Sequence, residues 1–181
     1  MLISHPLHWF GKLPIQAEFL SSNSHPNLET KFQDWIKAGQ NHIGAQLMTQ
    51  SNRHSLYGYA CCLCGDEKTD KFVGVLLTSY DSKGRSYPFV MIADMAQVDE
   101  TSFITAVAEC FKSLTFSLSD YGQQIEEKRF FSNLAEVLTA LYQHPQHGMD
   151  DWVEFYPVPR QLALSVPSLT PILYRKLMVR G

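Results

Sequence analysis

Residues 72–93 place the strongest constraint on how this chain folds. Two runs of apolar, β-branched and aromatic residues flank a short polar segment at 81–84, which is the pattern of a β-hairpin. Asp81 suits the first position of a type I turn, because its carboxylate can accept backbone N–H bonds. Gly84 suits the left-handed position that follows. The segment therefore predicts two strands joined by a turn and bulge.

The first arm of this hairpin is apolar on both faces. Three residues fall on one face and three on the other: Val73, Val75 and Leu77, then Phe72, Leu76 and Tyr80. A strand that is apolar on both faces is covered on both faces. We therefore expect the hairpin to lie inside a layered domain of helices and strands.

The clearest helix begins near Pro26, which is acceptable in a first turn, with Ser24 or Asn27 as its cap. Its apolar stripe is Leu28, Phe32, Trp35, Ile36, Ile43 and Leu47. Gly39 and Gly44 weaken its interior, which indicates a kink or a close packing contact.

Other elements are expected on both sides of the hairpin. A short strand running into a turn is predicted within 7–14, and extended segments are predicted near 17–20, 56–64, 152–156 and 162–166. Helices are predicted after a cap at Asp99, over about 126–142 with Phe131 in its stripe, and over about 171–179.

Length and composition limit the class of protein. At 181 residues, of which 45% are hydrophobic and 18% charged, the chain is expected to form one globular domain, 1–181. A net charge of −3 without a Lys/Arg-rich run argues against nucleic-acid binding. The start lacks the pattern of a signal peptide, and no apolar run approaches a membrane span, so we expect no direct membrane insertion.

Two clusters invite a metal hypothesis. Cys61, Cys62 and Cys64 are crowded into one expected strand, where neighbouring residues point to opposite faces, so at most two could share an ion. His144 and His147, followed by Asp150 and Asp151, have the composition of a solvated loop and lack a strong zinc spacing. We therefore expect no metal and no cofactor. Crowded cysteines are also a poor disulfide framework, which favours a reducing cytoplasm.

Catalytic signatures are absent from the sequence. It contains no Gly-x-Ser-x-Gly elbow, no P-loop and no Gly-x-Gly-x-x-Gly. A Cys-His or Ser-His-Asp site stays open, because such partners meet in space and not in sequence. The residues by themselves support an α-β domain and no catalytic assignment.

Two motifs point to a family. The first is Trp9-Phe10-Gly11-Lys12-Leu13-Pro14, and the second is Asp81-x-x-Gly84-Arg85-x-Tyr87-Pro88. In this order, with an aromatic helix containing Phe32, Trp35 and Ile36 between them, they resemble the signatures of the TagF/ImpM family of type VI secretion accessory proteins. The chain departs from the family after the first motif, where it has Ala17-Glu18-Phe19 in place of the frequent Gly-Asp-Phe.

The resemblance implies a fold and a function. The fold is an α/β, three-layer α-β-α sandwich with a mixed, largely antiparallel central sheet. The function is that of a cytoplasmic regulator, not an enzyme, which restrains type VI secretion after translation by binding the forkhead-associated (FHA) scaffold protein of the apparatus. The binding residues implied by the two motifs are Gly11, Lys12, Leu13, Pro14, Asp81, Gly84, Arg85, Tyr87 and Pro88.

Alternatives stay open from the residues alone. One is a small α-β enzyme with a cleft near the first motif and the hairpin turn, and another is a structural component of the secretion machine. For the motif residues two roles stay open: they either shape the fold or contact the partner. Arg85 illustrates the choice, because its guanidinium either folds back onto Asp81 and neighbouring carbonyls or projects as a bidentate contact. We favour the first arrangement for Arg85.

Overall fold

The computed structural model describes residues 7–44, 55–65, 71–122, 124–143, 150–166 and 169–179. The strands are β1 (Leu7–Gly11), β2 (Leu20–Ser21), β3 (Gly58–Cys64), β4 (Lys71–Leu77), β5 (Phe89–Asp94), β6 (Asp150–Tyr156) and β7 (Arg160–Val166). The helices are α1 (Pro26–Ile43), α3 (Glu100–Ser113), η1 (Leu118–Tyr121, a 3₁₀ helix), α4 (Glu127–Gln143) and α5 (Pro171–Met178).

The strands form one seven-stranded sheet in the order β2-β1-β5-β4-β3-β6-β7. The expected hairpin, β4 and β5, lies in its interior, with Leu77 opposite Phe89 and Phe72 opposite Asp94. Each strand pairing in the described part of the chain is antiparallel, so the sheet lacks the parallel admixture that the family resemblance implied. The α/β class itself is confirmed.

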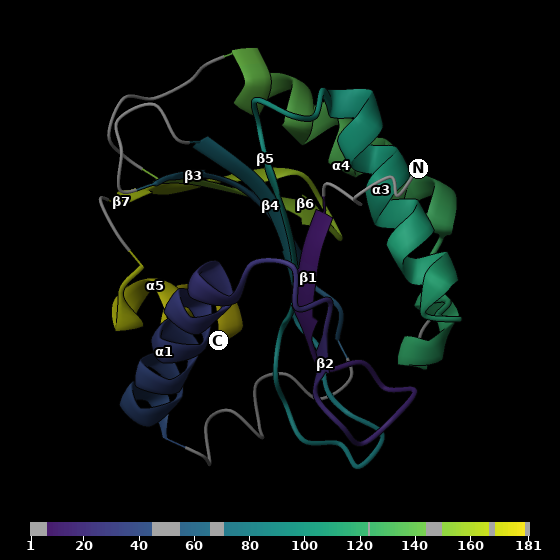
Figure 1. The fold of residues 1–181 in the computed structure, drawn as a ribbon, viewed down its shortest axis with the longest axis vertical. Helices are drawn as coiled ribbons and strands as arrows, with labels where there is room; N and C mark the ends of the chain where they lie inside the picture. The colour runs from purple at the N-terminus through teal and green to yellow at the C-terminus, as the bar shows by residue number, and fades with distance from the viewer. Residues whose placement is uncertain are drawn as a thin grey trace.

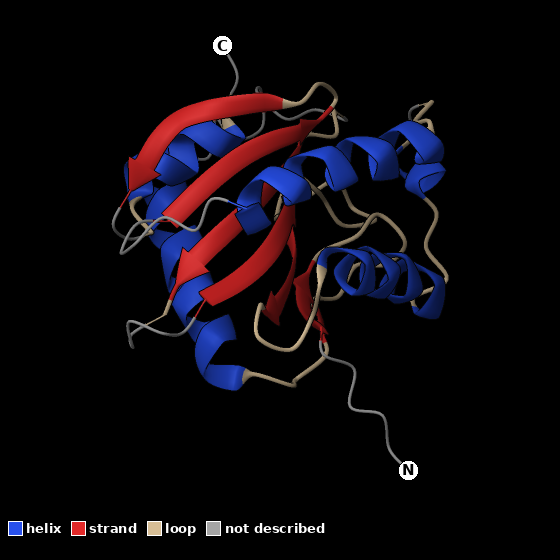
Figure 2. Cartoon of the chain, turned by 90° about the horizontal axis from the view of Figure 1, so that it is seen from above, coloured by secondary structure: helices blue, strands red, loops and turns tan. Residues whose placement is uncertain are grey.

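Helices cover the sheet on both faces (Figure 1). Helices α1 and α5 lie on one face, and α3 and α4 lie on the other. The view from above shows the twisted strands between these two helical layers (Figure 2). Each layer encloses its own hydrophobic cluster, which explains why the central strands are apolar on both sides.

The residues of β4 alternate between these two clusters. Val73, Val75 and Leu77 face α3 and α4, whereas Leu76 and Phe72 face α1 and α5, as the sequence pattern predicted. The placement of Tyr80 on the second face was wrong. The strand ends at Leu77, so its alternation does not extend to Tyr80, which packs on the α3/α4 side.

Helix α1 begins at Pro26 as expected, but neither Ser24 nor Asn27 caps it. The cap is His25, whose Nδ1 accepts a hydrogen bond from the Leu28 backbone N–H at 3.2 Å. Ser24 is engaged elsewhere, because its hydroxyl lies 2.8 Å from Nδ1 of His8. The helix ends at Ile43. The predicted stripe residue Leu47 lies outside the described residues, which stop at residue 44 in this region.

Gly39 is a close packing contact and not a kink. A Cβ at this position would lie 2.3 Å from the ring of Tyr174 on α5, which is closer than packed atoms approach. The absence of a side chain therefore lets the Tyr174 ring rest directly on the α1 backbone. The same ring meets Trp35 edge-on, with centroids 5.3 Å apart.

The remaining helices follow the predicted periodicity with one exception. Asp99 caps α3 through a 2.7 Å bond from the Ser102 backbone N–H, as expected. On α4 the fully buried aromatic residue is Phe130, one position before the predicted Phe131, which is only partly buried. Phe130 lies four residues before buried Leu134 and packs on Phe155 of β6 at 5.0 Å. Among the described helices, none is long and apolar enough to cross a membrane.

Trp35 provides a test of the α1/α5 layer. Its side chain is 4% exposed, packs on Trp152 and Tyr174, and donates a 2.7 Å hydrogen bond to the Thr170 carbonyl. Trp35→Ala is expected to lower the free energy of unfolding by about 3–5 kcal/mol, as large aromatic truncations in cores do. Urea unfolding of both proteins measures the difference.

The matched control for this variant is Lys37→Ala, because Lys37 is exposed on the same helix. Its effect is expected to stay within about 0.5 kcal/mol. Equal effects of the two substitutions would contradict the packing role of Trp35.

Candidate functional site

The two sequence motifs meet at the hairpin turn, where Asp81 is fully buried. Its Oδ1 accepts hydrogen bonds from the backbone N–H groups of Lys83 at 2.9 Å and Arg85 at 3.0 Å. The Gly84 N–H closes the turn on the Asp81 carbonyl at 2.9 Å, and Gly84 has φ of +79°. The predicted turn chemistry is therefore confirmed, because aspartate satisfies the backbone and glycine takes the left-handed position.

Two cations converge on the other carboxylate oxygen. Lys12 Nζ lies 3.0 Å and Arg85 Nε lies 2.7 Å from Asp81 Oδ2. The two backbone and two side-chain donors together meet both oxygens of a carboxylate that water does not reach. Such a complete set of donors is what makes burial of the charge tolerable.

The electrostatics of Asp81 follow from this geometry. Burial alone would raise its pKa, but the backbone hydrogen bond from Arg85, the side chains of Lys12 and Arg85, and the Lys83 N–H hold it well below the ordinary value. Asp81 is therefore ionised at neutral pH. We call this group of Lys12, Asp81 and Arg85 the Asp81 ion cluster.

The cluster fastens the loop that follows β1 onto the hairpin turn. Ser79 Oγ donates to the Lys12 carbonyl at 2.6 Å, and the Ser82 N–H donates to the Gln16 carbonyl at 2.9 Å. Arg85 Nη2 donates to the Ala17 carbonyl at 3.1 Å. The 12–17 segment is thus bonded to the turn region at Lys12, Gln16 and Ala17. Arg85 folds back onto both the carboxylate and a carbonyl, which is the arrangement favoured from the sequence.

The backbone conformation and close packing of Gly11 explain why the first motif has glycine at this position. It has φ of +130°, and a Cβ would lie 2.1 Å from the carbonyl oxygen of Pro88. Only glycine lets β1 approach the end of the second motif this closely. Two later residues of the motif differ in burial: Leu13 is fully buried on the α3/α4 side, whereas Pro14 is partly exposed.

Tyr87 and Pro88 complete the junction. The Tyr87 N–H donates to the Ser79 carbonyl at 3.0 Å, and its ring meets Phe19 edge-on at 5.4 Å. Burial raises the pKa of Tyr87, with a further contribution from Glu29, so the phenol is neutral. Pro88 is buried where β5 begins. The nine residues that the two motifs nominate for binding therefore lie together, where the loop after β1 meets the hairpin turn and the start of β5.

A protein-family model confirms the resemblance that these motifs suggested. The model for the TagF N-terminal domain, described as type VI secretion system-associated, matches residues 8–146, which is most of the chain. The chain belongs to this family.

Comparison with solved structures supports the fold of this TagF-family chain. The crystal structure of PA0076 from Pseudomonas aeruginosa PAO1 is similar with a TM-score of 0.53 and 14% identity, covering 97% of this chain and 95% of that one. At this identity the likeness concerns the fold alone. No curated protein matches the sequence.

The cysteines of this TagF-family chain do not converge. Cys61 faces the α1/α5 cluster and Cys62 faces the α3/α4 cluster, as the strand alternation predicted. Burial raises the pKa of Cys62 to about 11 and that of Cys61 well above the ordinary value, so both are protonated thiols. Among the described residues no group of three His, Cys, Asp or Glu could hold a metal. His144 and His147 lie outside them, and the absence of a metal stays a prediction.

Asp150 departs from its expected place in a solvated loop. It begins β6, is 5% exposed, and its Oδ1 accepts a hydrogen bond from the Cys64 N–H at 2.9 Å. Burial raises its pKa, partly opposed by that bond. Pairing of β3 with β6 places this carboxylate beside the end of the cysteine strand, which the linear sequence did not indicate.

Two groups important to the site were missed from the sequence. Ser79 joins the motifs through Lys12 and also accepts a 3.1 Å bond from the Tyr121 hydroxyl, so it links the turn to η1. His8 and Glu29 form a second polar network beside the first motif, with Nε2 and Oε2 3.5 Å apart. Neither Ser79 nor the pair of His8 and Glu29 belongs to a recognisable motif. Ala17, which stands where the family often has glycine, also gave no sign in the sequence that its carbonyl accepts a hydrogen bond from Arg85.

The charge of Asp81 yields a prediction about stability and pH. Asp81→Asn is expected to lower the free energy of unfolding by about 2–3 kcal/mol at pH 7, because hydrogen bonds to a charged acceptor are lost. The loss is not larger because Lys12 and Arg85 are partly exposed and regain hydration when the charge is removed. The folded pKa lies below the unfolded value of 3.8. The wild-type advantage is therefore complete well above pH 3.8 and fades as pH falls through and below it.

Urea unfolding at pH 7 and pH 3 measures this effect, with Asp34→Asn, an exposed substitution of the same kind on α1, as the control. The control is expected to change stability by less than about 0.5 kcal/mol. An equal loss for Asp81→Asn at both pH values would show that its charge is not the source.

Proposed function

We propose that this chain is a cytoplasmic, post-translational negative regulator of type VI secretion and that it acts by binding the FHA scaffold protein of the apparatus. The supporting observation is membership of the type VI secretion-associated TagF N-terminal domain family over residues 8–146. The family resemblance supplies the repressor role and the partner. The charged side chains of the two motifs, Lys12, Asp81 and Arg85, are bonded to one another. This arrangement agrees with a non-enzymatic role.

The proposed binding surface is the loop–turn face, which we define as residues 14–19 together with 82–85. The Asp81 ion cluster fixes these two segments against each other, so little conformational entropy is lost when a partner binds. Ile15 and Phe19 are each 37% exposed, and the Arg85 side chain is 60% exposed. Apolar side chains beside a cation on a rigid support are the composition of a protein-binding surface.

Secretion itself tests the regulatory role. Deleting the gene in the bacterium that encodes it is expected to raise release of the type VI tube protein into the medium, and excess protein is expected to suppress it. Immunoblots of culture supernatants measure both. Complementation with the wild-type gene is the control. Loss of secretion on deletion would instead support a structural component of the machine.

Ile15→Ala tests the loop–turn face. Its truncation is expected to weaken binding of the purified scaffold protein about tenfold, equivalent to about 1.4 kcal/mol, with little change in the melting temperature of the free chain. Isothermal titration calorimetry measures the affinity.

The matched control is Ile172→Ala on α5, because this isoleucine is also exposed, at 61%, and lies outside the loop–turn face. Its affinity is expected to match the wild type. If the scaffold binds but Ile172→Ala weakens it and Ile15→Ala does not, the surface is elsewhere and the proposed partner stands.

A further inference from the structure

The Asp81 ion cluster contains two cations and a single carboxylate, so it carries an excess positive charge. Asp81 Oδ2 lies 3.0 Å from Lys12 Nζ and 2.7 Å from Arg85 Nε. The side chain of Lys12 is 19% exposed, whereas that of Arg85 is 60% exposed. The uncompensated charge therefore meets solvent at the Arg85 guanidinium, on the loop–turn face.

The guanidinium of Arg85 keeps donors for a second acceptor. Its Nε donates to the Asp81 carboxylate, and its Nη2 donates to the Ala17 carbonyl. Its Nη1 carries two further N–H groups, and it makes no hydrogen bond to the part of the chain that the structure describes. Nη1 can therefore bind a carboxylate oxygen of another molecule while Arg85 still holds the turn.

Lys83 places a second cation at the same turn. Its backbone N–H bonds Asp81, but its ammonium group has no hydrogen bond or ion pair to any described residue. Between the two cations, a Cβ added to Gly84 would meet nothing within 4 Å, so the surface over the turn is open. Glu18 is the only acidic residue of the loop–turn face. This face and the Asp81 ion cluster together carry a charge of +1, in a chain whose net charge is −3.

Apolar side chains belong to the same face. Ile15 and Phe19 flank Ala17, whose carbonyl binds Arg85, and each is 37% exposed. The ring of Phe19 rests edge-on against Tyr87, with centroids 5.4 Å apart. A partner that reaches the Arg85 guanidinium therefore also meets apolar surface in the segment bonded to it.

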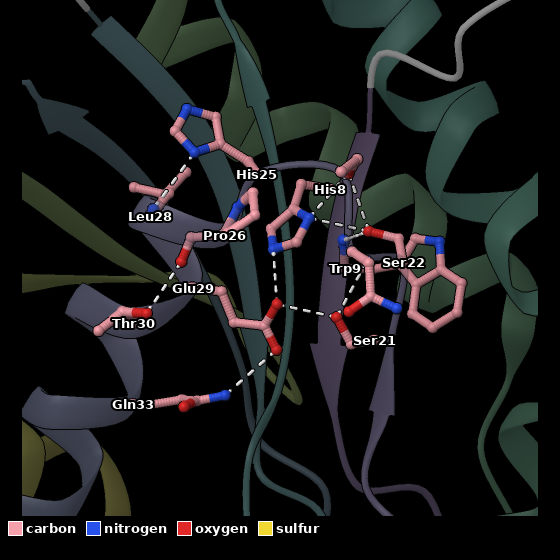
Figure 3. A network of polar contacts seen from close by, with 12 residues as sticks. His8, Trp9, Ser21, Ser22, His25, Pro26, Leu28, Glu29, Thr30 and Gln33 are labelled. Carbon is pink, nitrogen blue, oxygen red and sulfur yellow. Dashed lines mark hydrogen bonds and ion pairs between the residues drawn. The ribbon is translucent and has the colours of Figure 1, made fainter.

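The second polar network, around His8 and Glu29, holds the segment that follows Phe19 (Figure 3). Ser21 Oγ donates to Glu29 Oε2 at 2.8 Å, which attaches β2 to α1. The Ser22 N–H donates to the Trp9 carbonyl at 2.9 Å, which attaches the same segment to β1. The backbone around Phe19 is thus fixed on one side by this network and on the other by the bond between Ala17 and Arg85. The arrangement of the face exists before a partner binds, which lowers the entropy cost of binding.

The charge of the face favours a carboxylate over a phosphate. A phosphate group carries about −1.5 to −2 at pH 7, which exceeds the single excess charge of the face. It would also meet the exposed carboxylate of Glu18. One carboxylate matches the excess charge, and its planar shape suits the guanidinium.

We propose that the loop–turn face receives an acidic residue of the scaffold protein, an Asp or Glu whose carboxylate pairs with Arg85 and Lys83. An apolar side chain next to that residue packs on Phe19 and Ile15. The inference rests on the proposed function, because the scaffold protein is the occupant of the face. It adds the chemistry of the contact: the partner's carboxylate completes the Asp81 ion cluster from outside.

Reversal of one charge tests this assignment on the full chain. Lys83→Glu is expected to weaken binding of the purified scaffold protein at least about tenfold, because the partner's carboxylate then meets a like charge. Raising the sodium chloride concentration from about 50 to about 300 mM is expected to weaken the wild-type complex severalfold, because salt screens the pair. Isothermal titration calorimetry measures both effects.

Lys37→Glu is the matched control, because it makes the same change of charge at an exposed position of α1, outside the loop–turn face. Its affinity is expected to stay within about twofold of the wild type, because salt screens distant charges. A second control uses scaffold protein purified from the bacterium and treated with phosphatase. This treatment is expected to leave the affinity unchanged.

The outcomes separate this inference from the proposed function. Equal affinities of Lys83→Glu and Lys37→Glu would overturn the inference and leave the scaffold partner in place. Binding that is lost after phosphatase treatment would also overturn it, since the anion would then be a phosphate. If the wild-type chain binds neither treated nor untreated scaffold protein, the proposed partner is wrong and the inference falls with it.

Discussion

The ionised carboxylate of Asp81 is the constraint on which the motif region depends. A charge removed from water is tolerated only when hydrogen bonds and opposite charge replace its hydration. Here the replacements come from two sources, the turn's own backbone and side chains of both motifs. The turn, the loop after β1 and the end of the preceding strand are therefore fixed together. A change in any one of them leaves part of the charge unsatisfied.

The sequence predicted those parts of the fold that depend on local periodicity. The central hairpin, α1, α3 and the cysteine strand followed from apolar spacing and turn chemistry, because burial on one face imposes a repeat of two or near 3.6 residues. Errors arose where another contact took precedence. Tyr80 lies beyond the strand whose alternation was extended to it, and Ser24 bonds His8 in place of capping α1. The antiparallel pairing of every strand depends on chain connections that periodicity does not encode.

The sequence identified which residues belong to the candidate site, but it did not indicate which of them contact one another. Asp81 and Gly84 carried local turn chemistry, so their roles could be inferred. The bond between Lys12 and Asp81 joins residues 69 positions apart, and only the pairing of β1 with β5 brings them together. The glycine at position 11 is likewise explained only by the Pro88 carbonyl that approaches it. The same limit hid the network of His8 and Glu29, whose residue types are unremarkable until two elements meet.

The position of β1 has a consequence for how the chain is made. This strand is synthesised before β5, with which it pairs and whose residues follow about eighty positions later. At about 5–20 residues per second, a nascent chain has only the two-residue strand β2 to pair with β1 for several seconds before β5 exists. The hairpin of β4 and β5 is local and forms with little loop-closure cost, whereas docking of β1 closes a long loop. During synthesis the first motif is therefore a surface for chaperones and for wrong strand partners, and it becomes a folded surface only when the second motif has left the ribosome.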